Sequence, residues 1–335
     1  MNAERRRALA ALAVALPVGS LAIACDTGTE ISTGIGEPFR IAGGQFIEGD
    51  LPGTAPNADA GARVAGGNAG APRPLSITSV TFNSTLVLPG QAGKSVGGSV
   101  TNDAIAIGTR LAGMGTGYWV VPTGPPDPND PTSAVTFSLS ANFDPSVPPG
   151  VHDLLLVGIN GSGQAGAQNA TPLCIDSRIP DNGHACDPRK PVPHTVLTLR
   201  WDTNFDLDLH VRSPSGADFN PRQPYGGPLD AGTPAIPPGL PHIDRDSLGD
   251  CVPDGLNQED LVFDNAPPAG PYTVYVDPYA SCGQPSVRFE FTLYRASGTC
   301  PACSLAPVTT VSGELLASQE TGGNLVALQI AQIEF

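Results

Sequence analysis

The chain has few charged residues and little basic charge. Asp, Glu, Lys and Arg make up 15% of its 335 residues, and 17 Lys and Arg face 32 Asp and Glu, for a formal net charge of −15. Proteins that bind nucleic acid present basic patches to the phosphate backbone. The composition therefore excludes nucleic acid as a partner; an acidic surface of this kind keeps a protein soluble and is compatible with divalent cations.

Helical periodicity is also missing. Beyond the first 24 residues, no stretch repeats apolar residues every three or four positions over a useful length. The chain instead contains 40 Gly and 36 Pro, which separate short runs rich in β-branched and apolar residues. Short strands with turn signals between them predict an all-β protein, and their spacing favours antiparallel β-sandwiches.

No apolar run reaches the roughly 20 residues of a comfortable spanning helix. The longest one, residues 8–24, follows Glu4-Arg5-Arg6-Arg7 and ends at Cys25. A charged start, an apolar middle and a small-residue exit are typical of a secretory signal. The chain is therefore predicted to be exported, with residues 1–24 as its signal peptide.

The exit residues Leu21-Ala22-Ile23-Ala24-Cys25 resemble the lipobox of bacterial lipoproteins. Leu21 lies four residues before the cysteine rather than three, and Ala22 stands where Leu is usual. The resemblance implies cleavage before Cys25 and acylation of its thiol, which would anchor the protein to a lipid bilayer of the cell envelope. The outer membrane or cell surface is favoured over the inner membrane. The alternative is a plain secretory signal with Cys25 as an ordinary thiol.

Six further cysteines follow Cys25, and an even number in an exported chain predicts three disulfides. Fifteen pairings are open, and proximity along the chain favours Cys174–Cys186, Cys251–Cys282 and Cys300–Cys303. The last pair has a C-P-A-C spacing. A redox motif would need a helix start in an α/β pattern, and a zinc site would need a second close pair, so a small structural loop is the favoured interpretation.

The remaining pattern divides the chain into two β domains on a stalk. Residues 25–74 are rich in Gly, Ala and Pro and lack periodic apolar residues, so they are predicted to be a flexible tether. Residues 75–173 are predicted to form an immunoglobulin-like sandwich and residues 194–335 a second sandwich. Residues 174–193 form a cysteine-containing linker between them.

One strand of the second domain carries alternating acidic residues, Asp206-Leu207-Asp208-Leu209-His210-Val211. Successive side chains of a strand point to opposite faces. The apolar residues are therefore expected to face the core, while Asp206, Asp208 and His210 share the other face. Two carboxylates this close repel each other unless a cation or a basic partner lies between them.

A second acidic run places Asp244, Asp246 and Asp250 at the first, third and seventh positions of a loop. Calcium prefers six to eight oxygen ligands, which loops of alternating Asp often supply. The run is not an EF-hand, because Gly255 stands where the bidentate Glu would be. The sequence thus predicts a calcium site formed by Asp206, Asp208, Asp244, Asp246 and Asp250. The alternative is that these residues occupy ordinary turns and salt bridges.

These parts together resemble a β-sandwich family of bacterial surface and secreted proteins. The shared features are Trp201-Asp202, the D-L-D-L-H-V strand at 206–211, the Asp-rich loop at 244–254, and P-P-x-G-x-Y-x-V-x-V at 267–276. The resemblance covers about 140 residues. It implies an accessory or adhesive module that calcium could stabilise.

Two functions from different classes follow. The favoured one is a non-enzymatic binding or adhesion lipoprotein that recognises a protein or glycan, with Tyr118, Trp119, Tyr225 and Tyr279 as candidate contacts. The alternative is a metal-dependent hydrolase, or an enzyme's accessory subunit, that uses the Asp cluster. Loss of turnover on replacing Asp206 and Asp208 by Asn would separate the second from the first.

Overall fold

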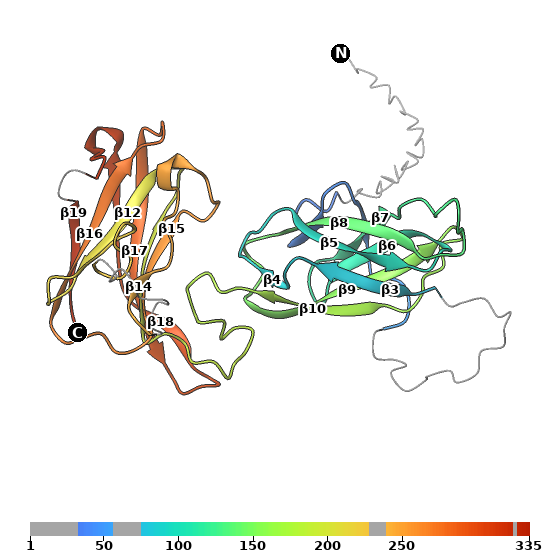
Figure 1. Ribbon diagram of the computed structural model, residues 1–335, viewed down its shortest axis with the longest axis horizontal. Helices are drawn as coiled ribbons and strands as arrows, with labels where there is room; N and C mark the ends of the chain where they lie inside the picture. Colours follow the sequence, from blue (N-terminus) through green and yellow to red (C-terminus); the bar gives the residue numbers. More distant parts are fainter. Residues whose placement is uncertain (1–32, 56–74, 228–238, 324–326) are drawn as a thin grey trace, which may run out of the picture.

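The computed structural model describes residues 33–55, 75–227, 239–323 and 327–335. It shows an all-β protein built of four sheets (Figure 1), which confirms the predicted fold class. Cys25, the predicted signal peptide and most of the predicted tether lie outside the described residues. Within the described ranges, no helix is long and apolar enough to cross a membrane.

The first sandwich comprises residues 33–55 and 75–175. One sheet has the strand order β1-β8-β5-β3 and the other β2-β7-β6-β9-β10-β4. Neighbouring strands are antiparallel except for β10 and β4, which are parallel. The strands are β1 (Phe39–Ile41), β2 (Gln45–Glu48), β3 (Ile77–Phe82), β4 (Leu86–Val87), β5 (Lys94–Val100), β6 (Ala104–Leu111), β7 (Gly117–Pro122), β8 (Val135–Phe143), β9 (Gly150–Asn160) and β10 (Asn169–Ile175).

Strand β8 shows why this segment folds as a sheet. Its alternate residues, from Val135 to Phe143, are buried and the intervening ones are exposed or half-buried, as expected for a strand with one face on the core. The buried faces of both sheets meet in one apolar core. Trp119 lies in that core and donates its indole N–H to the carbonyl of Phe39 at 2.8 Å.

The predicted tether is wrong for residues 33–55. Strand β1 pairs with β8, where Phe39 lies opposite Phe143, and β2 pairs with β7, where Phe46 lies opposite Trp119. These apolar residues are few and widely spaced, so they give no periodic signal. Nevertheless each strand contributes a buried aromatic ring to the core, and the first sandwich therefore begins well before residue 75.

The second sandwich comprises the described residues from 194 onward. Its sheets have the strand orders β14-β15-β11-β17-β18 and β13-β12-β16-β19. The strands are β11 (Thr195–Trp201), β12 (Asp206–Arg212), β13 (Asp218–Phe219), β14 (His242–Ile243), β15 (Gln258–Phe263), β16 (Pro271–Ala280), β17 (Ser286–Ser297), β18 (Ser304–Leu316) and β19 (Leu328–Glu334); two short 3₁₀ turns, η1 (Gly249–Cys251) and η2 (Ala317–Gln319), complete the fold.

Strand β12 lies between β16 and the short strand β13. It pairs with β16 along its whole length, whereas β13 pairs only with Val211 and Arg212. Among the described residues, no strand therefore covers one edge of the first part of β12, from Asp206 to His210. An unpaired edge leaves backbone N–H and C=O groups for other partners, and the acidic loop before β15 lies beside it.

All three disulfides that proximity favours are present. Cys174–Cys186 joins the end of β10 to the linker, Cys251–Cys282 joins η1 to the turn after β16, and Cys300–Cys303 closes the tip of the β17–β18 hairpin. The linker itself begins slightly later than predicted, because β10 continues to Ile175.

Candidate metal centre

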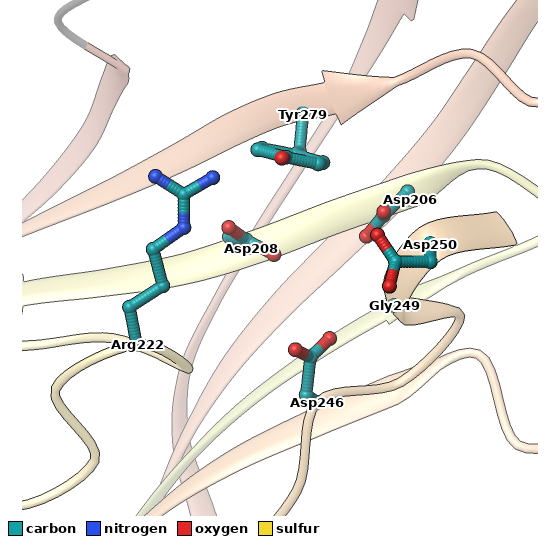
Figure 2. A pocket seen from close by; sticks show the side chains of 7 residues that line it. All are labelled: Asp206, Asp208, Arg222, Asp246, Gly249, Asp250 and Tyr279. Carbon is teal, nitrogen blue, oxygen red and sulfur yellow. The ribbon is translucent and has the colours of Figure 1, made fainter. Parts of the chain in front are cut away.

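The acidic strand β12 folds with the predicted alternation. Leu207, Leu209 and Val211 are fully buried in the apolar core. Asp206 and Asp208 point into a pocket beside the strand (Figure 2). Both aspartates are themselves buried, with exposed fractions of 1% and 6%. The face that the sequence predicts to be polar is therefore shielded from solvent, which makes its charges costly to maintain.

The acidic loop supplies the opposite wall of this pocket. Asp246 and Asp250 approach Asp206 and Asp208 from η1 and the residues before it (Figure 2). Asp250 has a left-handed backbone with φ of +55°, a conformation that costs a non-glycine residue free energy. Gly249 leaves room for the Asp246 carboxylate within the loop, since a Cβ there would lie 2.5 Å from one of its oxygens.

Together these residues form a compact oxygen-lined cavity of about 110 Å³. The carboxylates of Asp206, Asp208 and Asp246 each place an oxygen within 4.8 Å of the other two. The remaining lining residues are Arg222, Gly249, Asp250 and Tyr279. The guanidinium of Arg222 lies 4.8 Å above the Tyr279 ring, which holds one positive charge at the side of the pocket.

Asp206 is the most unusual member of the group. It is 1% exposed, and neither carboxylate oxygen has a hydrogen-bond partner within the described part of the chain. Burial, reinforced by the charges of Asp208, Asp246 and Asp250, raises its pKa to about 7, while the nearby backbone N–H of Asp250 acts weakly in the opposite direction. Buried carboxylates without a hydrogen bond are rare, because no protein interaction then offsets the free-energy cost of removing the carboxylate from water.

The other pocket carboxylates are perturbed in the same direction. The pKa of Asp208 is raised to about 7, first by burial and then by Asp246, with His210 opposing the shift. The pKa of Asp246 is raised by burial and by Asp250. All three raised pKa values reflect carboxylates gathered around one cavity, and a cation placed there would favour the charged form of each.

Glu259 organises both walls of the pocket, and the sequence analysis did not identify this role. Its carboxylate, completely buried on β15, accepts the backbone N–H of Leu209 at 2.7 Å and that of Ser247 at 3.3 Å. The first bond satisfies the open edge of β12 next to Asp208, and the second fixes the loop next to Asp246. Burial and the charge of Asp208 raise the Glu259 pKa well above its usual value.

Asp244 does not belong to the pocket, although the loop spacing predicts it as a ligand. One of its oxygens accepts a bond from the Arg245 side chain at 2.7 Å, and the other accepts the backbone N–H of Asp260 at 3.0 Å. Its carboxylate is therefore used to attach the loop to β15. The salt-bridge alternative is correct for this residue.

A neighbouring group on the same face extends the acidic surface. Asp208, His210 and Asp277 also place ligand atoms within 4.8 Å of one another. Asp277 is buried on β16 and accepts a hydrogen bond from the Thr321 hydroxyl. His210 lies 3.7 Å from Asp218 and 3.8 Å from Asp277. Asp277 directly follows the P-P-x-G-x-Y-x-V-x-V stretch. An acidic residue in an otherwise apolar strand is the sequence signal that could have identified it as a site residue.

The four aromatic residues predicted to contact a partner are in different environments. Trp119 is buried in the core of the first sandwich, so it is not a surface contact. Tyr118, Tyr225 and Tyr279 are each partly exposed. Of these, Tyr279 lines the acidic pocket.

No protein-family model matches this chain, and no curated protein sequence matches it.

Proposed function

We propose that the acidic pocket of the second sandwich binds Ca²⁺, and that the protein is an exported, non-enzymatic binding lipoprotein whose second domain depends on this ion. Asp206 carries the proposal. Its two buried oxygens have no hydrogen-bond partner among the described residues and line a cavity with Asp208, Asp246 and Asp250. A cation would supply the interaction that these oxygens lack.

The chemistry of the ligand set favours calcium over other ions. All the candidate ligands are carboxylate oxygens, which suit a hard cation, and the pocket lining includes neither His nor Cys. Four carboxylates offer up to eight oxygens, which suits the six to eight ligands of Ca²⁺. Mg²⁺ demands a stricter octahedral arrangement and retains several waters. The ion would also bridge β12 to the η1 loop.

The experiment compares two aspartates, Asp206 inside the pocket and Asp244 outside it. In the wild-type chain, Ca²⁺ at 100 times its Kd should stabilise the second sandwich by about 2.7 kcal/mol, measured by thermal unfolding with calcium and with chelator. Asp206→Asn should abolish this shift. In chelator, the same substitution should raise the midpoint, because it removes a buried carboxylate without a partner.

Asp244→Asn is the matched control. It should weaken the fold through the lost Arg245 contact but keep the calcium-dependent shift, because Asp244 lies outside the pocket. Equal midpoints for the wild-type chain in calcium and in chelator would contradict the proposal. So would a calcium shift of undiminished size in Asp206→Asn.

The membrane anchor is a separate part of the proposal. It rests on the lipobox-like residues 21–25, and Cys25 supplies the thiol for acylation. Multiple acyl chains would hold the protein at a bilayer, because each buried methylene contributes about 0.8 kcal/mol. The two sandwiches, the first predicted to be immunoglobulin-like, would then present a protein- or glycan-binding surface. Mass spectrometry should find a mature N-terminus that begins at an acylated Cys25; an unmodified Cys25 would refute the anchor.

A further inference from the structure

A cluster of sulfur and nitrogen donors lies where the linker meets the β17–β18 hairpin, away from the acidic pocket. The disulfide Cys300–Cys303 closes the tip of this hairpin. His184 of the linker lies against it, with both ring nitrogens 3.8 Å from the Cys303 sulfur. Donor atoms of the three residues all lie within 4.8 Å of one another.

The linker holds the His184 ring in a defined orientation. The Asp181 carboxylate accepts the backbone N–H groups of Gly183 and Ala185, each at 2.8 Å, and so fixes the loop on both sides of the histidine. His184 Nδ1 lies 2.6 Å from the Lys190 carbonyl oxygen. A carbonyl only accepts, so Nδ1 donates, and in the neutral ring Nε2 is then the nitrogen that offers a lone pair. This is the arrangement by which ligating histidines are oriented in metal sites.

The distances fit a small tetrahedral ion. Zn–S bonds of about 2.3 Å and Zn–N bonds of about 2.0–2.1 Å place sulfur and nitrogen roughly 3.6 Å apart in a tetrahedron. The Cys303 sulfur and His184 Nε2 are already 3.8 Å apart. The two sulfurs would need to separate to about 3.8 Å, which requires the disulfide to open.

We propose that reduction of Cys300–Cys303 by a dithiol converts this corner into a Cys₂His site for a thiophilic cation such as Zn²⁺. The dithiol gives up two electrons and two protons and becomes a disulfide, while Cys300 and Cys303 become thiols. The cation then binds both sulfurs as thiolates, together with His184 Nε2, and two protons are released. A water molecule takes the fourth position.

This disulfide is the best suited of the three for such a role. Cys300 is exposed while Cys303 is buried, so a reductant reaches the pair from the hairpin tip. The bond spans three residues, against 12 and 31 for the other two, and a shorter loop constrains the unfolded chain less. Among the described residues, the other disulfide cysteines belong to no group of potential metal ligands.

The Cys300–Cys303–His184 site has different donor atoms from the acidic pocket, so metal binding at one site can be tested without metal binding at the other. Thiolate and imidazole donors select soft or borderline cations, whereas carboxylates select hard ones. The test therefore uses Co²⁺, whose thiolate complexes absorb by sulfur-to-metal charge transfer, as a probe for the zinc site. Co²⁺ bound by carboxylates alone gives no such band.

The full chain is treated with limiting dithiol until alkylation and mass mapping of a sample show that, of the three disulfides, only Cys300–Cys303 has opened. We expect one equivalent of Co²⁺ to produce the charge-transfer band in this chain and none in the oxidised chain, with Zn²⁺ abolishing the band. His184→Ala should lower the affinity by more than about tenfold. His152→Ala, in the first sandwich, is the matched control and should behave as wild type.

A reduced chain without a charge-transfer band would overturn the proposal. Reduced His184→Ala with the wild-type affinity would also overturn it, because the site would then be an unstructured dithiol. The double variant Cys300→Ser, Cys303→Ser should lose the band after the same treatment. If this variant does not fold, the His184→Ala comparison still decides the question.

Discussion

The two sandwiches share an architecture but differ in what they bury. Each has two sheets around one apolar core. In the described part of the first sandwich, Lys94 is the one buried charged side chain, whereas the second buries five acidic residues: Asp206, Asp208, Glu259, Asp260 and Asp277. Apolar alternation therefore specifies the fold of both domains, and the added carboxylates distinguish the second as the candidate binding domain.

The largest expected effect tests whether the two cores are separate. Phe39→Ala should destabilise only the first sandwich, and Phe291→Ala only the second, each by about 3–5 kcal/mol, because each removes a buried ring from one core. The two tryptophans make the measurement direct, since Trp119 lies in the first core and Trp201 in the second. Denaturant unfolding of single-tryptophan variants reports each domain.

The same experiment tests the placement of the N-terminal strands. Phe39 packs edge-on against Phe143, with ring centroids 5.4 Å apart. If residues 33–55 were a tether, Phe39→Ala would leave the first transition unchanged. A loss of stability in the Trp201 signal would instead show that the two cores unfold together.

A smaller effect is expected at Glu259. Glu259→Gln leaves one amide oxygen where two carboxylate oxygens accepted the N–H groups of Leu209 and Ser247. One buried N–H then has no acceptor, which should cost about 1–3 kcal/mol. Calcium affinity should fall about 10- to 100-fold, as for other residues that orient metal ligands. Titration calorimetry measures the affinity and chemical unfolding the stability.

Glu290→Gln provides the control for this substitution. Glu290 is exposed on β17, so the change should remain within about 0.5 kcal/mol. Equal effects of the two substitutions would show that the Glu259 bonds contribute nothing specific to the second sandwich.

The last expected change is the pH dependence of the second sandwich in chelator. Burial first, with like charges second, raises the pKa values of Asp206 and Asp260 to about 7 in the folded state. Above pH 4 the unfolded chain releases these protons while the folded chain retains them. Stability should therefore fall as pH rises from about 4 to about 7.

Calcium should remove or reverse the part of this slope that comes from Asp206, which lines the pocket, because the ion stabilises that carboxylate's charged form. The first sandwich, with no buried carboxylate in its described residues, should show a much flatter profile. The tryptophan reporters separate the two curves. If the stability of both sandwiches in chelator depended on pH in the same way, the predicted electrostatic difference between the domains would be wrong.

Much of the fold was predictable from local pattern. The alternation on β8 and β17, and the turn residues between strands, predicted the all-β fold correctly. Phe39 and Phe46 were missed because their strands have three and four residues, too few for a period. Their partners β8 and β7 lie about 100 and 70 positions along the chain, so only tertiary pairing shows their role.

The candidate site was also predictable only in part, because local spacing identifies some of its residues and tertiary contacts determine the others. Strand geometry places Asp206 and Asp208 together, and the loop spacing correctly includes Asp246 and Asp250. Spacing does not reveal that Asp244 is held by Arg245 and the Asp260 backbone. Nor does it reveal Glu259, because its role depends on the open edge of β12 meeting β15 across the sandwich.

The disulfide Cys251–Cys282 has a consequence for when the domain matures. It fastens the loop that carries Asp250 to the turn after β16, close to Tyr279 of the pocket wall. If the chain is exported as we propose, this bond would be absent before export, because cytosolic thiols are kept reduced, and the loop would then have no covalent attachment to that wall. In the proposed exported protein, pocket assembly would thereby be linked to arrival in an oxidising compartment.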